Sequence, residues 1–252
     1  DSTPEPNLSS LHVSGQCWFD ETADGLFKDG EPTLAGIKIE MDGVKNGLHY
    51  ETVSGADGKW CIDEIEPAFY NLTVTAPDGM MFAKVSKRGG RRSIITKDGT
   101  NRASRQMDLN DRESKDKQYI GFTWAGEITG RCFLDANYNG MYDEGEEPMP
   151  GVKITAIKPA MDEEVAKTFS AEDGTYTLTG LRGNNYKMRA VLPEDGSDFS
   201  KTVSDPLGNH FQSRPGRREN FWNNFVLNEG QSREMNVGVI YPGSITGTVY
   251  YD

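Results

Sequence analysis

The sequence predicts an all-β protein built from tandem antiparallel β-sandwich modules. Three observations lead to this prediction: apolar and polar residues alternate over short stretches, Asp-Gly and Pro-x-Gly turns separate those stretches, and one pattern recurs along the chain. Alternation with a period of two is typical of strands that bury one face. Short strands joined by regular turns are typical of sandwiches.

The clearest strand patterns place alternate apolar residues on one face. They are Ile37 and Ile39, then Trp60, Ile62 and Ile65, then Tyr70, Leu72 and Val74, then Tyr176, Leu178 and Leu181. The helical signal is weak, since only 110–118 and 159–167 could hold a helical turn or two.

An internal repeat divides the chain. The string GQCWFD at 15–20 recurs as GRCFLD at 130–135 and as GTVYYD at 247–252, spacings of 115 and 117 residues. We therefore predict one module at 8–124 and a second at 125–241. Residues 1–7 resemble a linker, and 242–252 are expected to be the first strand of a truncated third module, as in a piece of a longer protein.

Composition excludes several classes of function. The chain has 252 residues, with 27 Lys and Arg against 39 Asp and Glu, for a net charge of −12. Such an acidic chain is a poor general ligand for nucleic acid. It has no apolar run of 18 residues that could span a membrane. We expect a monomer whose partners are neighbouring modules of the same chain.

An acidic loop follows the first strand of the second module. It has the spacing of a twelve-position calcium loop, with oxygen ligands at positions 1, 3, 5 and 9, glycine at 6, a carbonyl at 7 and glutamate at 12. The predicted ligands are Asp135, Asn137, Asn139, the carbonyl of Met141, Asp143 and Glu146.

The first module repeats this frame with a lysine at position 9. The predicted ligands are Asp20, Thr22, Asp24, the carbonyl of Leu26 and Glu31. Lys28 takes position 9, where the second loop has Asp143, so we predict weaker calcium binding in the first loop. The alternative is an acidic turn without an ion, which the recurrence at one structural position makes less favourable.

Several strings in the first module together resemble the B-domain family of serine-aspartate-repeat surface proteins. They are GQCWFD (15–20), DGEP (29–32), LAGI (34–37), DGKW (57–60) and PAFY (67–70). The second module matches with EP at 147–148 and MPGV at 149–152, whereas 79–107 and 196–225 depart from the pattern.

The resemblance implies calcium-binding, prealbumin-like β-sandwiches, similar to the B-type stalk domains of collagen adhesins. It also implies a secreted or cell-wall-attached place on a bacterial surface, where such modules would display an adhesive or catalytic head.

Two basic segments offer an alternative function. Residues 84–105 carry eight Lys and Arg against one Asp, and 214–218 echo part of this segment. Arg88, Arg91, Arg92, Arg214, Arg217 and Arg218 could bind an anionic glycan or a host matrix protein. The competing interpretation, which we favour, is a loop folded onto its own acidic module or a solvated loop.

The cysteines and histidines give no catalytic motif. Cys17 and Cys132 share a repeat position with Val249, which indicates buried thiols, while Cys61 is out of phase with Trp60 and is expected to face away from the core. A Cys17–Cys61 disulfide remains an alternative. The three histidines are isolated and hydrolase or phosphate-loop motifs are absent, so we predict no enzyme.

Overall fold

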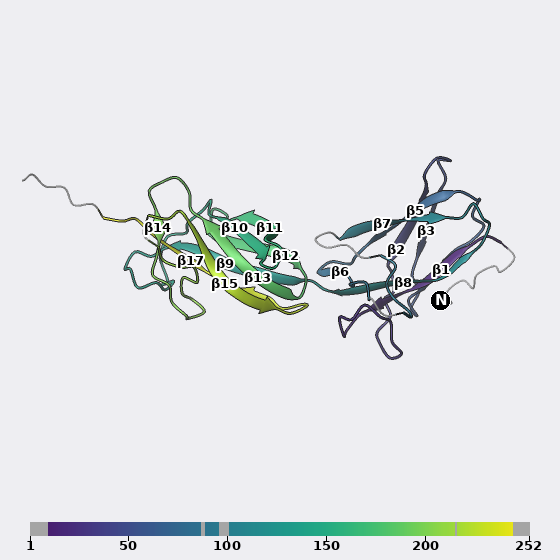
Figure 1. Cartoon of the computed structure of the whole chain (residues 1–252), viewed down its shortest axis with the longest axis horizontal. Coiled ribbons are helices and arrows are strands. Elements are labelled where there is room, and N and C mark those ends of the chain that lie inside the picture. The colour runs from purple at the N-terminus through teal and green to yellow at the C-terminus, as the bar shows by residue number, and fades with distance from the viewer. Residues whose placement is uncertain (1–9, 87–88, 96–100, 215, 244–252) are drawn as a thin grey trace, which may run out of the picture. The chain divides into compact units, whose positions relative to one another are not determined.

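The chain forms two compact units, seen in a computed structural model that describes residues 10–86, 89–95, 101–214 and 216–243 (Figure 1). Unit 1 is Asp1–Ala125 and unit 2 is Gly126–Asp252. The predicted linker at 1–7 and the predicted third-module strand, apart from residues 242 and 243, lie outside the described residues.

Unit 1 is a sandwich of two four-stranded sheets, in the orders β4-β1-β8-β6 and β3-β2-β5-β7. Its strands are β1 (Val13–Phe19), β2 (Lys38–Gly43), β3 (His49–Val53), β4 (Lys59–Ile62), β5 (Phe69–Thr75), β6 (Met80–Phe82), β7 (Arg102–Asp108) and β8 (Lys115–Trp124). The predicted alternation is confirmed: Tyr70, Leu72 and Val74 of β5 are fully buried.

Unit 2 repeats this arrangement with sheets in the orders β12-β9-β17-β14 and β11-β10-β13-β15, and β16 also pairs with β9. Its strands are β9 (Gly126–Leu134), β10 (Lys153–Lys158), β11 (Glu163–Phe169), β12 (Thr175–Leu181), β13 (Asn184–Val191), β14 (Asp198–Phe199), β15 (Glu219–Leu227), β16 (Ser232–Glu234) and β17 (Val237–Ile240). The predicted tandem β-sandwich fold is therefore confirmed.

Each unit has its own hydrophobic core between its two sheets. In unit 1, Trp60 and Phe122 from one sheet meet Ile39 and Leu72 from the other. Unit 2 is centred in the same way on residues that include Tyr176 and Met188. Burial of large apolar side chains is the main force that holds such sheets together, at about 25 cal/mol per Å² of apolar surface.

One pairing was not predicted from the alternating pattern. Most strand pairs are antiparallel, but β1 lies parallel to β8, with Cys17 opposite Ile120 and Phe19 opposite Phe122. Unit 2 pairs β9 with β17 in the same parallel sense. The first and last strands of each unit are thus neighbours inside one sheet.

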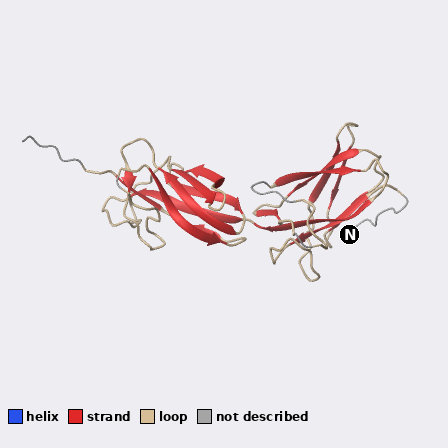
Figure 2. Ribbon diagram, in the orientation of Figure 1, coloured by secondary structure: helices blue, strands red, loops and turns tan. Residues whose placement is uncertain are grey.

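The possible helical turns at 110–118 and 159–167 were wrong. Among the described residues there is no helix, and β8 begins at Lys115 and β11 at Glu163 (Figure 2). Residues 110–114 and 159–162 form turns and irregular backbone, and the rest of each stretch is the start of a half-exposed strand. Membrane-spanning helices are likewise not found in the described part of the chain.

Candidate metal sites in the acidic loops

The first acidic loop begins where β1 ends and is folded around the carboxylate of Asp20. Asp20 is 1% exposed and accepts backbone N–H groups of Asp24 at 3.2 Å and Gly25 at 2.7 Å. Gly25 has φ +77°, and a Cβ there would lie 2.0 Å from the carbonyl oxygen of Lys84. Only glycine fits this turn, as expected for position 6 of the loop.

A lysine ammonium occupies the polar face of this first loop. Lys28 Nζ lies 2.5 Å from Asp24 Oδ2 and donates to Thr22 Oγ1 at 2.9 Å. The hydrogen bond from Lys28 is the main reason that the pKa of Asp24 lies below its usual value. Two predicted calcium ligands therefore already face a positive charge from the chain itself.

Glu31 has one oxygen that is satisfied and one that is not. Its Oε2 accepts the backbone N–H of Lys28 at 2.8 Å, whereas Oε1 is buried without a hydrogen-bond partner in the described structure. Burial raises the pKa of Glu31, and the charges of Asp20 and Asp24 raise it further. A buried carboxylate oxygen without a donor is unfavourable unless a cation or proton is supplied.

The second acidic loop repeats the scaffold with an additional donor. Asp135 is 1% exposed and accepts N–H groups of Asn139 at 3.1 Å and Gly140 at 2.8 Å. The hydroxyl of Ser200 also donates to Asp135. Ala83 is the residue of unit 1 that is equivalent to Ser200. The backbone N–H of Ala83 bonds the carbonyl of Gly121 in β8, and that of Ser200 bonds the carbonyl of Gly238 in β17.

Two amide side chains converge on the carboxylate at position 9 of the second loop. Asn137 Nδ2 and Asn139 Nδ2 both donate to Asp143 Oδ2 at 2.8 Å. Glu146 closes the loop, since its oxygens accept N–H groups of Ala136 at 3.0 Å and Asp143 at 3.1 Å. The structure thus brings the predicted side-chain ligands of this loop together.

The donor set is mixed rather than purely acidic. Within the described residues no group of three or more His, Cys, Asp and Glu side chains forms a metal site by itself. The loops add amide, hydroxyl and backbone oxygens, which are acceptable to calcium because it takes six to eight oxygen ligands of any of these kinds. The residues present therefore fit calcium, and the carbonyl roles of Leu26 and Met141 remain predictions.

The basic segment of unit 1 folds back onto the acidic loop. Arg91 pairs with Asp29 at 2.7 Å and lies over the ring of Phe27, 4.6 Å from its centroid. Arg92 bridges to Leu26 through the backbone. Arg88 lies outside the described residues. This arrangement favours the interpretation in which the basic segment packs on its own module.

Arg218 ties the basic segment of unit 2 to its own module. Arg218 pairs with Glu194 at 2.7 Å and donates to the carbonyl of Leu192 at 3.0 Å. Arg214 and Arg217 are exposed and are joined to each other by a backbone hydrogen bond. Binding of an anionic partner by these residues stays a prediction.

The three cysteines are free, which contradicts a Cys17–Cys61 disulfide. Cys17 and Cys132 are fully buried, as predicted, and burial raises the pKa of both thiols. Cys61 is also buried, outside the cluster that contains Trp60, and its thiol donates to Asp63 at 3.3 Å. These thiols are packing residues rather than nucleophiles.

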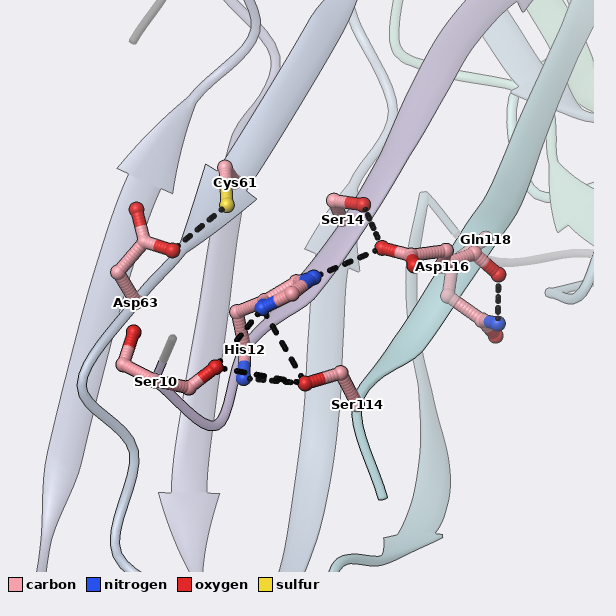
Figure 3. Close-up of polar contacts among 8 residues, drawn as sticks. All are labelled: Ser10, His12, Ser14, Cys61, Asp63, Ser114, Asp116 and Gln118. Atoms are coloured by element: carbon pink, nitrogen blue, oxygen red, sulfur yellow. Dashed lines mark hydrogen bonds and ion pairs between the residues drawn. The ribbon is translucent and has the colours of Figure 1, made fainter. Parts of the chain in front are cut away.

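Sequence reasoning missed a polar cluster at the start of β1 (Figure 3). His12 is 3% exposed, and its Nε2 lies 3.1 Å from Asp116 Oδ1 while its Nδ1 lies 2.9 Å from the carbonyl oxygen of Ser10. Ser14 donates to the same Asp116 oxygen at 2.5 Å, and this hydrogen bond is the main cause that lowers the pKa of Asp116. Ser114 accepts the backbone N–H of His12. The cluster joins β1 to β8, with the imidazole buried and the Asp116 carboxylate half-exposed.

Comparison with known proteins establishes the family. The chain matches the SdrD B-like domain at residues 12–122 and again at 126–237. It therefore belongs to the SdrD B-like domain family and carries two such domains in tandem, as the repeat and the two folded units indicate.

The named relatives align with most of this chain but over a small part of their own length. Serine-aspartate repeat-containing protein F of Staphylococcus epidermidis is 21% identical over 204 residues, covering 77% of this chain and 11% of that protein. Serine-aspartate repeat-containing protein D of Staphylococcus aureus strain Newman is 23% identical, covering 70% and 13%. Colossin-B of Dictyostelium discoideum is 24% identical, covering 73% and 6%. This chain thus spans a small part of the length of each relative.

The solved structures that match this chain at low TM-scores include pilins. The minor pilin GBS52 of Streptococcus agalactiae is 12% identical with a TM-score of 0.38, covering 96% of this chain and 100% of that one. The shaft pilin SpaA from Lactobacillus rhamnosus GG is 11% identical with a TM-score of 0.34, covering 94% and 100%.

Proposed function

We propose that the two units are calcium-stabilised spacer modules of a cell-surface protein of the bacterial type, which separate a distal adhesive or catalytic head from the surface. The observation that carries this proposal is the recurrence of one loop scaffold. In both units a buried aspartate, Asp20 or Asp135, follows the first strand, and the loop closes around it toward Glu31 or Glu146.

The chain supplies the ligands in a defined order. Asp20, Thr22, Asp24 and Glu31 would hold calcium in unit 1, and Asp135, Asn137, Asn139, Asp143 and Glu146 would hold it in unit 2, with backbone oxygens of Leu26 and Met141. When bound, the ion supplies two positive charges among carboxylates that otherwise repel each other. Lys28 already gives part of this neutralisation in unit 1, because its ammonium contacts Asp24.

Family membership supports the surface location. The named bacterial relatives are serine-aspartate repeat-containing proteins, and the similar structures include pilins. An ion that binds only the folded state stabilises it by about 2.7 kcal/mol at a hundred times its dissociation constant. Such modules would therefore gain stability in a calcium-rich medium.

Isothermal titration of chelator-treated chain with calcium chloride tests the proposal. We expect saturable binding, with a tighter event that is lost in Glu146→Gln and a weaker event that is lost in Glu31→Gln. Calcium should also raise the melting temperature of the parent chain.

Matched controls are the neighbouring exposed carboxylates, Glu147→Gln in unit 2 and Glu21→Gln in unit 1, which should bind calcium like the parent. If millimolar calcium gave no heat and left the melting temperature unchanged, the loops would be acidic turns and the proposal would be wrong.

A further inference from the structure

A groove lies at one end of unit 1, away from the acidic loop. It is formed by the turn after β2, the start of β5 and the end of β7, and it has a volume of about 420 Å³. Its lining includes Val44, Lys45, Asn46, Phe69, Gln106 and Asn110. A groove of this size is comparable to small-molecule sites, which begin at about 300 Å³.

The floor of the groove is apolar and open to solvent. Phe69 is 46% exposed and Val44 is 41% exposed. The backbone N–H of Val44 donates to the carbonyl of Phe69 at 2.8 Å, which keeps the two side chains adjacent. Exposed apolar surface next to polar groups is a common mark of a binding site.

The rim carries amide side chains whose hydrogen-bond donors and acceptors are partly unused. In the described structure the Gln106 side chain makes no hydrogen bond, and Asn110 uses only its amide nitrogen, toward Asp108 at 2.8 Å. Asn46 is held in place by Tyr70 and by the N–H of Leu48. Each amide has both donors and acceptors, so a ligand group that also does both would match them.

The charge of the lining restricts the ligand. None of the lining residues is acidic, and Lys45 is the one charged residue among them. A cationic ligand would find no counter-charge in the groove, and a polyanion would meet the repulsion of a chain with net charge −12.

We propose that this groove binds a neutral saccharide unit. The apolar C–H face of a sugar ring would pack on Phe69 and Val44, and its hydroxyls, which donate and accept, would meet the amides of Gln106 and Asn110. A peptide is a poorer match, because its N–H and C=O groups alternate along a line, whereas these amides surround an aromatic face.

Unit 2 lacks this floor. By the repeat alignment, Pro159 stands at the position of Val44 and Asn185 at the position of Phe69. The saccharide site is therefore a property of unit 1 alone, and it is independent of calcium because no ligand of either acidic loop lines it.

Amide chemical-shift mapping on the full chain tests the proposal, with glucose, galactose, mannose and N-acetylglucosamine as probes at about 10 mM, in the range of a weak site. At least one sugar should shift the amides around Phe69 and Gln106 and leave unit 2 unchanged. Phe69→Asn, the residue that unit 2 has, should weaken binding about tenfold. Gln106→Ala should also weaken it.

Gln106 is exposed and Phe69 is 46% exposed, so both variants should stay folded, and their melting temperatures separate a loss of binding from a loss of folding. The control Asn101→Ala changes an exposed amide side chain at the opposite end of β7, outside the groove, and should bind like the parent. Shifts caused by a short apolar peptide but by no sugar, or no shifts at all, would overturn the proposal. Calcium binding would be unaffected by either result.

Discussion

The two acidic loops share a scaffold but differ in what faces its centre. In both loops a buried aspartate accepts two backbone N–H groups, Asp20 in unit 1 and Asp135 in unit 2. At position 9, unit 1 places the ammonium of Lys28, and unit 2 places the carboxylate of Asp143. The backbone therefore fixes the shape of the loop, while its charge is set separately by the side chains at positions 5 and 9, where Asp24 and Lys28 stand in unit 1 and Asn139 and Asp143 in unit 2.

The segments that cover the two loops are also built differently. In unit 1, Ser93 accepts the N–H of Gly121 with its hydroxyl. In unit 2, Asn209 takes this role, accepting the N–H of Gly238 at 3.2 Å. The next residue in unit 2 is the buried His210, whose Nδ1 accepts the N–H of Asn236 at 3.1 Å. Unit 2 thus covers its loop with a network that includes a histidine, whereas unit 1 has Ile94 at that position.

The largest effect should come from the shared scaffold. Gly140 has φ +79°, and a Cβ there would lie 2.5 Å from the carbonyl oxygen of Lys201, so Gly140→Ala should lower the free energy of unfolding of unit 2 by about 3 kcal/mol. Gly145 has φ +97° and open space around it, so Gly145→Ala should cost only about 1 kcal/mol. Hydrogen exchange of unit 2 peptides in chelator measures both, and equal losses would refute the steric argument.

Exchanging the charge at position 9 of the two loops should have the second-largest effect. Under the proposed calcium function, Lys28→Asp should tighten binding in unit 1 about tenfold, and Asp143→Lys should weaken it in unit 2 by at least as much. Calorimetric titration measures both constants. Lys117→Asp changes the net charge equally at an exposed residue of β8 and is the control. If it matched Lys28→Asp, the difference between the loops would be a matter of net charge only.

Ser200→Ala should have a smaller effect. It removes the hydroxyl donor to the buried Asp135 and installs the residue that unit 1 has, Ala83. Two backbone donors remain, so we expect a loss of about 1 kcal/mol in the unfolding free energy of unit 2. Thermal unfolding in chelator gives this value. The reciprocal variant Ala83→Ser should not destabilise unit 1 by the same amount if the donor is what matters.

The smallest effect should be on the pH dependence of the stability of unit 2. Burial lowers the pKa of His210 in the folded state, and nearby Arg233 lowers it further. The neutral imidazole therefore contributes stability above its unfolded pKa of about 6.5, and this is lost as the pH falls through the folded pKa. Unit 1 has Ile94 at the position of His210. The variant His210→Ile should therefore remove this part of the pH dependence of stability. An unchanged slope between about pH 5 and 7 in denaturant unfolding would contradict the assignment.

Local features of the fold could be predicted, and long-range ones could not. Alternation in β5 and the acidic loops depend on residues within about a dozen positions, so the sequence is enough to locate them. The parallel contact of β1 with β8 and the His12–Asp116 pair join residues about a hundred positions apart. The alternation of apolar and polar residues within a strand does not indicate which distant strand it pairs with. For the same reason, the sequence did not determine that Arg91 contacts Asp29, which is 62 residues away.

In each unit the first strand lies parallel to the last, β1 beside β8 and β9 beside β17. The chain enters at the start of one and leaves at the end of the other, so tension on the chain slides these strands past each other in opposite directions. Their hydrogen bonds then carry the load together instead of opening one by one. The lifetime of a stretched unit is therefore governed by the rate at which this one strand pair shears.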